Sequence, residues 1–334
     1  MSRPILPALI VAAAGIIACF GTLALIPLLR RAAVLDRPNE RSSHATPTPR
    51  GGGIAVTAAI LSAWFAFIPI GVVPARFVAA LLAAALLAGL SWLDDLRDLP
   101  AVMRLLAQFA AVVTGILVLA PAAPVLPDWP MGIALGVAVA VLWVWFVNLF
   151  NFMDGIDGIA GTEAAAIGIG LLLFGGFGEG QGWAGAPLAA ATAAAALGFL
   201  VWNWAPARIF LGDVGSVPLG YLLGFLLLWA AARGYWRIAL ILPLYFLADA
   251  TITLFRRLVR GERVWRPHRS HFYQRAVQRG LGHAAVVRRM IAADTMLIGC
   301  GWAAENGAGD TALSLAFATV LALLFSLAGL PRRA

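Results

Sequence analysis

The chain of 334 residues is a succession of apolar runs, most of them close to twenty residues long. Hydrophobic residues make up 62% of it and charged residues only 12%, whereas soluble domains are about a quarter charged. An α-helix needs about 20 apolar residues to cross a bilayer. The sequence therefore predicts an all-α, polytopic integral membrane protein with about eleven transmembrane helices. The predicted spans are residues 5–28, 53–73, 76–93, 101–121, 131–150, 160–178, 187–205, 214–232, 237–255, 290–304 and 311–328.

The basic residues predict how these spans are oriented. All 24 of them are arginines. If the N-terminus lies outside, twenty of the arginines fall in inner loops or in the C-terminal tail. Positive residues accumulate on the cytoplasmic side of membrane proteins. We therefore expect the N-terminus outside and the C-terminus in the cytoplasm.

Polar motifs gather in the predicted inner loops, and the outer loops contain no motif of comparable density. We therefore expect a single transmembrane catalytic domain, residues 1–334, with its active site on one face of the membrane. The loops expected to form that site are residues 30–52, 94–104, 148–160, 206–214 and 256–289.

Two adjacent carboxylates, Asp94 and Asp95, end the third predicted span. Acidic residues oppose the macrodipole at the C-terminus of a helix, so a solvated helix end is the less favoured explanation for them. Asn148, Asn151, Asp154 and Asp157 follow at strict three-residue spacing. Clustered polar groups at a bilayer boundary are by default a functional site. Their oxygens suit Mg²⁺ that arrives with a phosphorylated substrate.

Asp213 precedes the eighth predicted span and is expected to cap its helix. Free N–H groups at that helix start, with the following Ser216, would then accept an anion beside a metal-binding carboxylate. The run Gly51–Gly53 could likewise cradle phosphate, although a glycine run alone is weak evidence for it.

The basic stretch 256–275 contains two histidines, His268 and His271, on either side of Arg269. A topology determinant bound to anionic lipids would explain the arginines but not the histidines, so this loop is a candidate phosphate or nucleotide site. His283 stands apart and is expected to be structural. Asp249 is placed to pair with Arg256 inside the bundle.

Together these motifs resemble those of the polyprenyl-phosphate N-acetylhexosamine-1-phosphate transferases, glycosyltransferase family 4. Five motifs occur in the family's order between residue 36 and about residue 289. The resemblance implies a multi-pass protein of the bacterial inner membrane with a cytoplasmic active site and a requirement for Mg²⁺, which Mn²⁺ could replace. The implied partners are a UDP-N-acetylhexosamine and undecaprenyl phosphate, with no nucleic acid; a homodimer is left open.

The resemblance also implies roles for individual residues. Asp94 and Asp95 match paired aspartates near the lipid phosphate. Asn151, Asp154 and Asp157 match the cluster near metal and nucleotide, and Asp213 matches the magnesium ligand. His268 and His271 fall at the family's histidine motif. The implied substrate-binding residues are the amides Asn148 and Asn203, the uracil-stacking Phe210, the phosphate-binding Arg256, Arg257 and Arg269, and His44, which stands near a lysine of some relatives.

The segment 268–275 resembles the subgroup that starts lipopolysaccharide O-antigen chains, whereas the muramoyl branch has a run of histidines there. The implied reaction transfers a HexNAc-1-phosphate to undecaprenyl phosphate and releases UMP, forming the first lipid-diphosphate-sugar of a cell-envelope polysaccharide. Direct attack and a covalent aspartyl intermediate both remain open.

An alternative from another class is a membrane transporter of an anionic or sugar-phosphate substrate. It would have carboxylates near the midplane, but the carboxylates are expected at inner helix ends. A CDP-alcohol phosphotransferase would need an Asp-Gly closely followed by Ala-Arg and further aspartates, which the sequence lacks.

Overall fold

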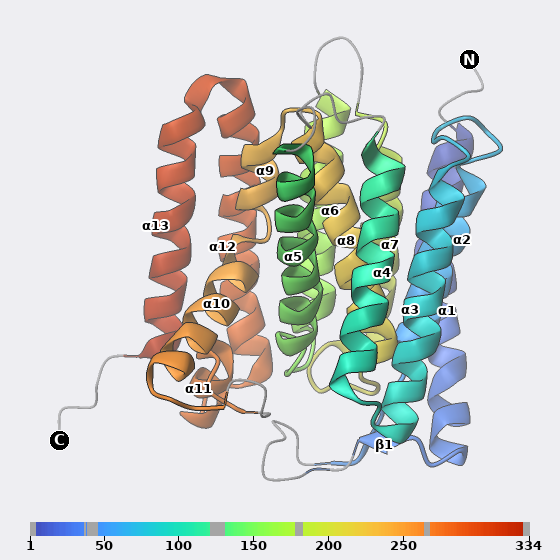
Figure 1. Ribbon diagram of the computed structural model, residues 1–334. Coiled ribbons are helices and arrows are strands. Elements are labelled where there is room, and N and C mark those ends of the chain that lie inside the picture. The colour runs from blue at the N-terminus through green and yellow to red at the C-terminus, as the bar shows by residue number, and fades with distance from the viewer. Residues whose placement is uncertain are drawn as a thin grey trace.

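The computed structural model describes residues 5–36, 38, 46–120, 131–177, 183–263 and 268–329. In these ranges the chain is a bundle of helices with one two-residue strand pair (Figure 1). The helices are α1 (Ile5–Arg31), α2 (Gly53–Ala66), α3 (Phe77–Arg97), α4 (Ala101–Leu119), α5 (Met131–Phe152), α6 (Ile159–Phe177), α7 (Ala186–Asn203), α8 (Asp213–Ala232), α9 (Trp236–Ile241), α10 (Leu244–Val259), α11 (Phe272–Gln278), α12 (His283–Ala303) and α13 (Gly309–Ala328). The strands are β1 (Leu35–Asp36) and β2 (Thr48–Pro49), paired antiparallel.

The prediction of an all-α, multi-pass membrane protein is confirmed. In the described part, seven segments are long and apolar enough to cross a membrane, and α2 and α6 are shorter apolar helices. One of the seven runs from α12 through α13 and reverses direction at Asn306 and Gly307 (Figure 1). The number of spans and the side on which each terminus lies stay predictions.

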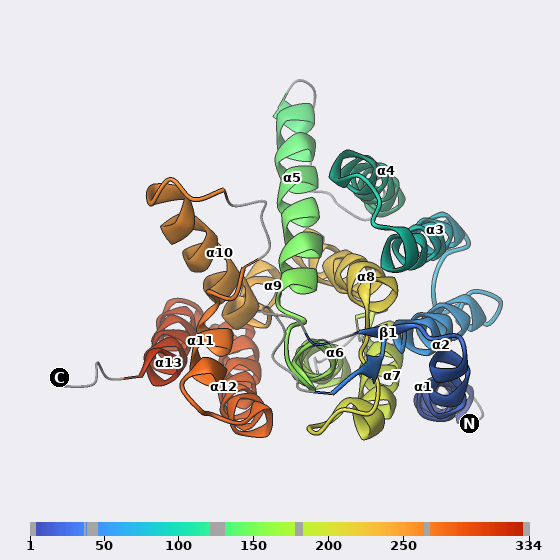
Figure 2. The same ribbon diagram turned by 90° about the horizontal axis from the view of Figure 1, so that it is seen from below.

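The structure differs from the predicted span 237–255, which it divides into α9 and α10 at Pro243. Proline has no backbone N–H and its ring clashes with the preceding helical turn, so the helix ends there. Downstream, α10 runs obliquely away from α8 (Figure 2). Its outer face leaves Phe255, Leu258 and Val259 more than half exposed.

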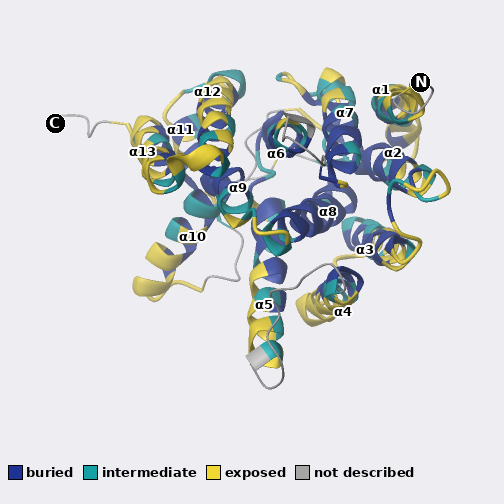
Figure 3. Ribbon diagram, turned by 90° about the horizontal axis from the view of Figure 1, so that it is seen from above, coloured by how far each residue is buried: buried dark blue, intermediate teal, exposed yellow. Residues whose placement is uncertain are grey.

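The core lies around α8, which is buried along nearly its whole length (Figure 3). Aromatic rings pack around it: Trp143 of α5 stacks on Tyr221, and Phe77 of α3 meets Phe225 edge-on. The outer helices present apolar side chains outward, for example Leu86 at 74% and Phe325 at 75% exposure. Such a surface is stable in lipid rather than in water.

Two acidic side chains lie inside spans and were not predicted there. Glu163 of α6 is fully buried, and Asp294, near the middle of α12, is 4% exposed. Neither carboxylate has a hydrogen-bond partner among the described residues. The expectation that the carboxylates sit at inner helix ends is therefore wrong for this pair.

Glycine lets α2 approach α8. A β-carbon added at Gly53 would lie 2.2 Å from the Cα atom of Gly215, so no larger residue fits between the two backbones. Small residues commonly permit this kind of close contact between membrane helices. The contact accounts for Gly53 without a phosphate ligand.

We expect Gly53→Ala to destabilise the protein by about 1–3 kcal/mol, because the added methyl group forces α2 and α8 apart. Thermal unfolding in detergent measures the effect. Gly89→Ala is the matched control, since a β-carbon there meets nothing within 4 Å. Equal melting temperatures for the two variants would contradict the proposed contact.

Candidate active site

The predicted inner loops do converge at one end of the bundle (Figure 1). The segment after β2 is joined to the loop before α8: Gly51 and Gly52 donate to the carbonyl oxygen of Phe210, and Phe210 N–H donates to that of Pro49. The loop after α5 reaches the same place, because Asn151 donates to Ser216 Oγ over 2.8 Å. Three segments that are distant in the sequence are therefore joined directly in one region.

Asp95 caps the N-terminus of α8 from the neighbouring helix α3. Its carboxylate accepts the N–H of Asp213 over 3.2 Å and that of Val214 over 3.0 Å. The expectation that Asp213 is the N-cap is wrong: Asp213 is the first residue of α8, and its predecessor Gly212 has φ +75°. The N–H groups predicted to receive a ligand anion are thus occupied by Asp95, which frees the Asp213 side chain to face the site.

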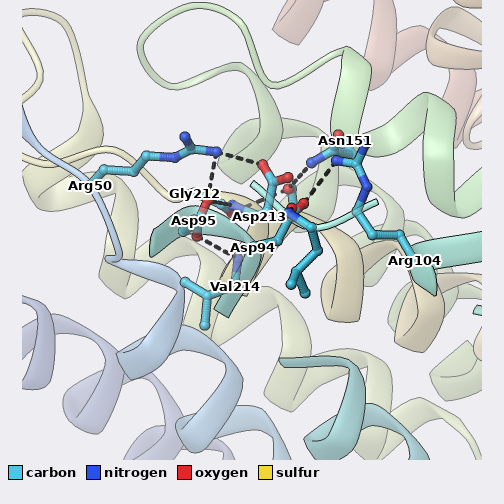
Figure 4. Close-up of polar contacts among 10 residues, drawn as sticks. Arg50, Asp94, Asp95, Arg104, Asn151, Gly212, Asp213 and Val214 are labelled. Atoms are coloured by element: carbon cyan, nitrogen blue, oxygen red, sulfur yellow. Dashed lines mark hydrogen bonds and ion pairs between the residues drawn. The ribbon is translucent and has the colours of Figure 1, made fainter. Parts of the chain in front are cut away.

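Arg50 links the two carboxylates (Figure 4). One guanidinium nitrogen lies 2.6 Å from Asp95 Oδ1 and 2.7 Å from Asp213 Oδ1. From the sequence, Arg50 was expected only to be one of the arginines of the first inner loop. Its place at the end of the first inner loop, directly before the glycine run, was the signal that could have singled it out.

Asp94, the neighbour of Asp95 on α3, pairs with Arg104 over 2.8 Å (Figure 4). Its second oxygen accepts the N–H of Leu99. The Asp94 side chain is 6% exposed and that of Arg104 is 44% exposed. The cation, rather than Asp94, is therefore the accessible member of this pair.

Asp154 lies in the loop between α5 and α6, within electrostatic reach of Asp213 and Arg50. Burial, and after it the neighbouring Asp213 carboxylate, raise the pKa of Asp154 to about 7. No hydrogen bond to its carboxylate forms among the described residues. A cation next to Asp154 and Asp213 would relieve this accumulation of negative charge.

A long groove of about 670 Å³ leads to these residues. It runs between α3 and α4 on one side and α10 on the other, with α5 along it (Figure 2). Most of its lining is apolar, including Leu87, Phe109, Val144 and Leu254. The polar residues of its lining include Asp94, Arg104, Gln108, Asn148, Asn151 and Asp213. Asn148 is held there by Gln108, whose Oε1 accepts a 2.6 Å hydrogen bond.

Asp157 and Asn203 brace the loops beneath the site. Asp157 Oδ2 accepts the N–H of Ala207 over 3.0 Å and lies 3.2 Å from His283 Nδ1. The buried Asn203 accepts from Gly158 N–H and donates to the carbonyl oxygen of Ile209. His283, expected to stand apart, contacts a predicted catalytic residue. These contacts show that Asp157 and Asn203 position the chain here; their predicted catalytic and substrate-binding roles stay predictions.

The histidine motif is fixed by Asp249, the residue that was predicted to pair with Arg256. Asp249 accepts the N–H groups of Phe272 and Tyr273, and its Oδ1 lies 3.2 Å from His271 Nδ1. Both Asp249 and His271 are buried. The predicted pair of Asp249 and Arg256 fails because the start of α11, with its unsatisfied N–H groups, takes up that carboxylate.

His268 is the more accessible histidine and stacks on His271 at 4.8 Å. Its Nδ1 lies 2.8 Å from Ser270 Oγ. Burial, followed by the charges of His271 and Arg257, lowers the pKa of His268 to about 4. His268 is therefore mostly neutral near pH 7 without a bound anion, and its role at the site stays a prediction.

The predicted phosphate-binding arginines are dispersed. Arg257 pairs with Glu262 over 2.8 Å, Arg256 lies over the ring of Phe272, and Arg269 is exposed. None of the contacts described above joins them to Asp213. The roles of Arg256, Arg257, Arg269 and Phe210 in substrate binding stay predictions, and His44 lies outside the described residues.

Comparison with known proteins decides the family. Residues 77–231 match the family described as Glycosyl transferase family 4. The chain is 31% identical to decaprenyl-phosphate N-acetylglucosaminephosphotransferase of Mycobacterium tuberculosis (strain CDC 1551 / Oshkosh), over 84% of this chain and 78% of the relative. The chain belongs to the polyprenyl-phosphate N-acetylhexosamine-1-phosphate transferase family.

Two further relatives of the family are similar over most of their length. The probable undecaprenyl-phosphate N-acetylglucosaminyl 1-phosphate transferase of Bacillus subtilis (strain 168) is 28% identical over 81% of this chain and 78% of its own. The undecaprenyl-phosphate alpha-N-acetylglucosaminyl 1-phosphate transferase of Escherichia coli (strain K12) is 28% identical over 83% and 78%, respectively. The family member described here is thus a membrane-embedded polyprenyl-phosphate sugar-1-phosphate transferase.

We expect Asp249→Asn to loosen the histidine motif of this transferase. An amide nitrogen cannot accept the hydrogen bonds that hold the start of α11, and a broken buried pair costs about 3–5 kcal/mol. Hydrogen exchange in residues 268–278 should accelerate. Asp310→Asn is the control, because Asp310 is fully exposed and its 3.9 Å pair with Arg237 contributes little to stability. Unchanged protection of 268–278 in Asp249→Asn would contradict this role.

Proposed function

We propose that this enzyme transfers N-acetylhexosamine-1-phosphate from a UDP-sugar to undecaprenyl phosphate, releasing UMP. The observation that carries the proposal is the groove, whose lining combines apolar side chains from five helices with the polar cluster at Asp213. A lipid phosphate has the same division into a long apolar chain and a charged head. A water-soluble substrate would have no use for the apolar part.

The acceptor phosphate is expected beside Arg104. The guanidinium lines the groove and is exposed enough to reach a ligand, while Asp94 fixes its position. Arginine binds phosphate oxygens with two parallel hydrogen bonds. Asp94 would then act through Arg104, which refines the predicted direct contact of Asp94 with the lipid phosphate.

The donor set near Asp213 fits Mg²⁺. Among the described residues, no three acidic, histidine or cysteine side chains form a ready-made metal site. Mg²⁺ is, however, usually held by one or two carboxylates together with substrate phosphates and water. Asp213 would supply the carboxylate, and Asp154 or the side-chain amide oxygen of Asn151 would be the further protein ligand. The ion would neutralise the donor diphosphate and the departing UMP.

We favour direct attack of the acceptor phosphate on the donor. An oxygen of the lipid phosphate would form a bond to the β-phosphorus of the UDP-sugar, and the bond from that phosphorus to UMP would break. The protein's part is to position two anions and to neutralise their repulsion. UMP exchange into the UDP-sugar without acceptor would instead support a covalent aspartyl intermediate.

The sequence around His268 supports a donor of the kind used to start O-antigen chains over the muramoyl pentapeptide. The arrangement also supports an active site on the cytoplasmic face, since the arginine-rich loops surround it. The family membership disfavours the transporter alternative.

The proposed reaction is tested with the purified full chain, UDP-N-acetylglucosamine and undecaprenyl phosphate, with product identified by mass spectrometry. We expect product with Mg²⁺ or Mn²⁺ and none with EDTA. Asp213→Asn should lose activity by about 10²–10³-fold. Full activity of Asp213→Asn would contradict the assignment of Asp213 as the metal ligand. A lipid product that lacks the sugar phosphate would contradict the proposed reaction.

The groove makes a separate prediction about the acceptor. Val141 of α5 is half exposed and lines the groove, whereas Val137, one turn earlier, is similarly exposed and does not. We expect Val141→Trp to raise KM for the lipid several-fold and to leave KM for the UDP-sugar unchanged, because the added ring occupies the space of the chain. Val137→Trp should alter neither constant. Equal effects of the two variants on KM for the lipid would show that the lipid does not bind in this groove.

A further inference from the structure

Arg50 occupies the point where the carboxylates of the site converge. The same guanidinium nitrogen contacts Asp95 Oδ1 at 2.6 Å and Asp213 Oδ1 at 2.7 Å (Figure 4). Asp154 and Asp36 are also within electrostatic reach of Arg50 or of its partners. Among the described residues, this guanidinium is the cation in contact with the carboxylate of Asp213.

A divalent ion bound to Asp213 would bring a second cation to the carboxylate that Arg50 already contacts over 2.7 Å. Mg²⁺ binds carboxylate oxygens at about 2.1 Å, so the ion and the guanidinium would lie within a few ångströms of each other. Two cations at one carboxylate also repel each other. We propose that Arg50 is a positioning residue that neutralises the metal-free site and is displaced from Asp213 when the divalent ion binds.

The hydrogen bonds around Arg50 suit such an exchange. Asp95 keeps two backbone donors, Asp213 N–H and Val214 N–H, when the guanidinium moves. By contrast, Arg50 is the only side-chain partner of the Asp213 carboxylate among the described residues. The backbone of Arg50 is held by the pairing with Phe210 and by its own N–H bond to the carbonyl oxygen of Val34. The exchange therefore needs movement of the side chain alone.

Displacement gives Arg50 a second task, which rests on the proposed function. Its side chain is 35% exposed, and a guanidinium freed from Asp213 remains beside the metal that it gave way to. Arginine is suited to binding phosphate oxygens. The diphosphate of the nucleotide sugar is the anion that would arrive with that metal.

The inference is tested by binding rather than by turnover. Mn²⁺ alone is titrated into the purified full chain in detergent and followed by electron paramagnetic resonance. We expect Arg50→Gln to bind Mn²⁺ about ten-fold more tightly than the unaltered protein. Arg50→Lys, whose shorter side chain carries a single point charge, should have an affinity between the two.

The matched control is Arg104→Gln, which breaks the pair with Asp94 and should change Mn²⁺ affinity less than two-fold. Melting temperatures verify that each variant is folded, and Arg50→Lys carries the comparison if Arg50→Gln is not.

A second measurement uses UDP at saturating Mn²⁺, where Arg50→Gln should bind the nucleotide at least ten-fold more weakly. Opposite changes in metal and nucleotide affinity are not expected from a merely structural residue. Unchanged or weaker Mn²⁺ binding by Arg50→Gln would overturn the inference, and unchanged UDP binding would overturn its second step. Asp213→Asn separates this from the proposed function: if Mn²⁺ binding does not depend on Asp213, the assigned metal site itself is wrong.

Discussion

The structure depends on the concentration of negative charge at one end of an apolar bundle. Asp95, Asp154 and Asp213 lie within electrostatic reach of one another, and their repulsion is strong where water is scarce. The fold offsets it with the α8 N-terminus on Asp95 and with Arg50 between Asp95 and Asp213. The remaining negative charge, at Asp154 and Asp213, is the local property on which the proposed binding of a divalent cation rests.

The central position of α8 follows from the same requirement. Its first turn must meet α3, α5 and the segment after β2 at once, and the Gly53–Gly215 contact brings α2 close enough for this. Buried hydrogen bonds from Asn203 and Asp249 then fix the flanking loops. Several residues that the sequence predicts to be catalytic or substrate-binding, such as Asp157 and Asn203, hydrogen-bond to other groups of the protein. Fewer of them line the groove.

The sequence was sufficient for the helical membrane fold, because apolar runs of about twenty residues are a local signal, and the Asn/Asp cluster was a local signal for the candidate site proposed here. It was not sufficient for Asp95 as the cap of a distant helix or for Arg50 as its partner, since both depend on contacts between loops far apart in the chain. Pro243 was visible, but its effect on the ninth predicted span depended on packing. Glu163 and Asp294 were missed because each is a single acidic residue in an apolar run.

The oblique course of α10 has a consequence for how a lipid acceptor reaches the enzyme. Phe255, Leu258 and Val141 line the groove and are at least half exposed on the outer surface of the bundle. A lipid can therefore move sideways into the groove while its tail stays among other lipid tails. The quantity that governs saturation is then the mole fraction of acceptor in the bilayer, so diluting the membrane with inert lipid should slow the enzyme even when the bulk concentration is constant.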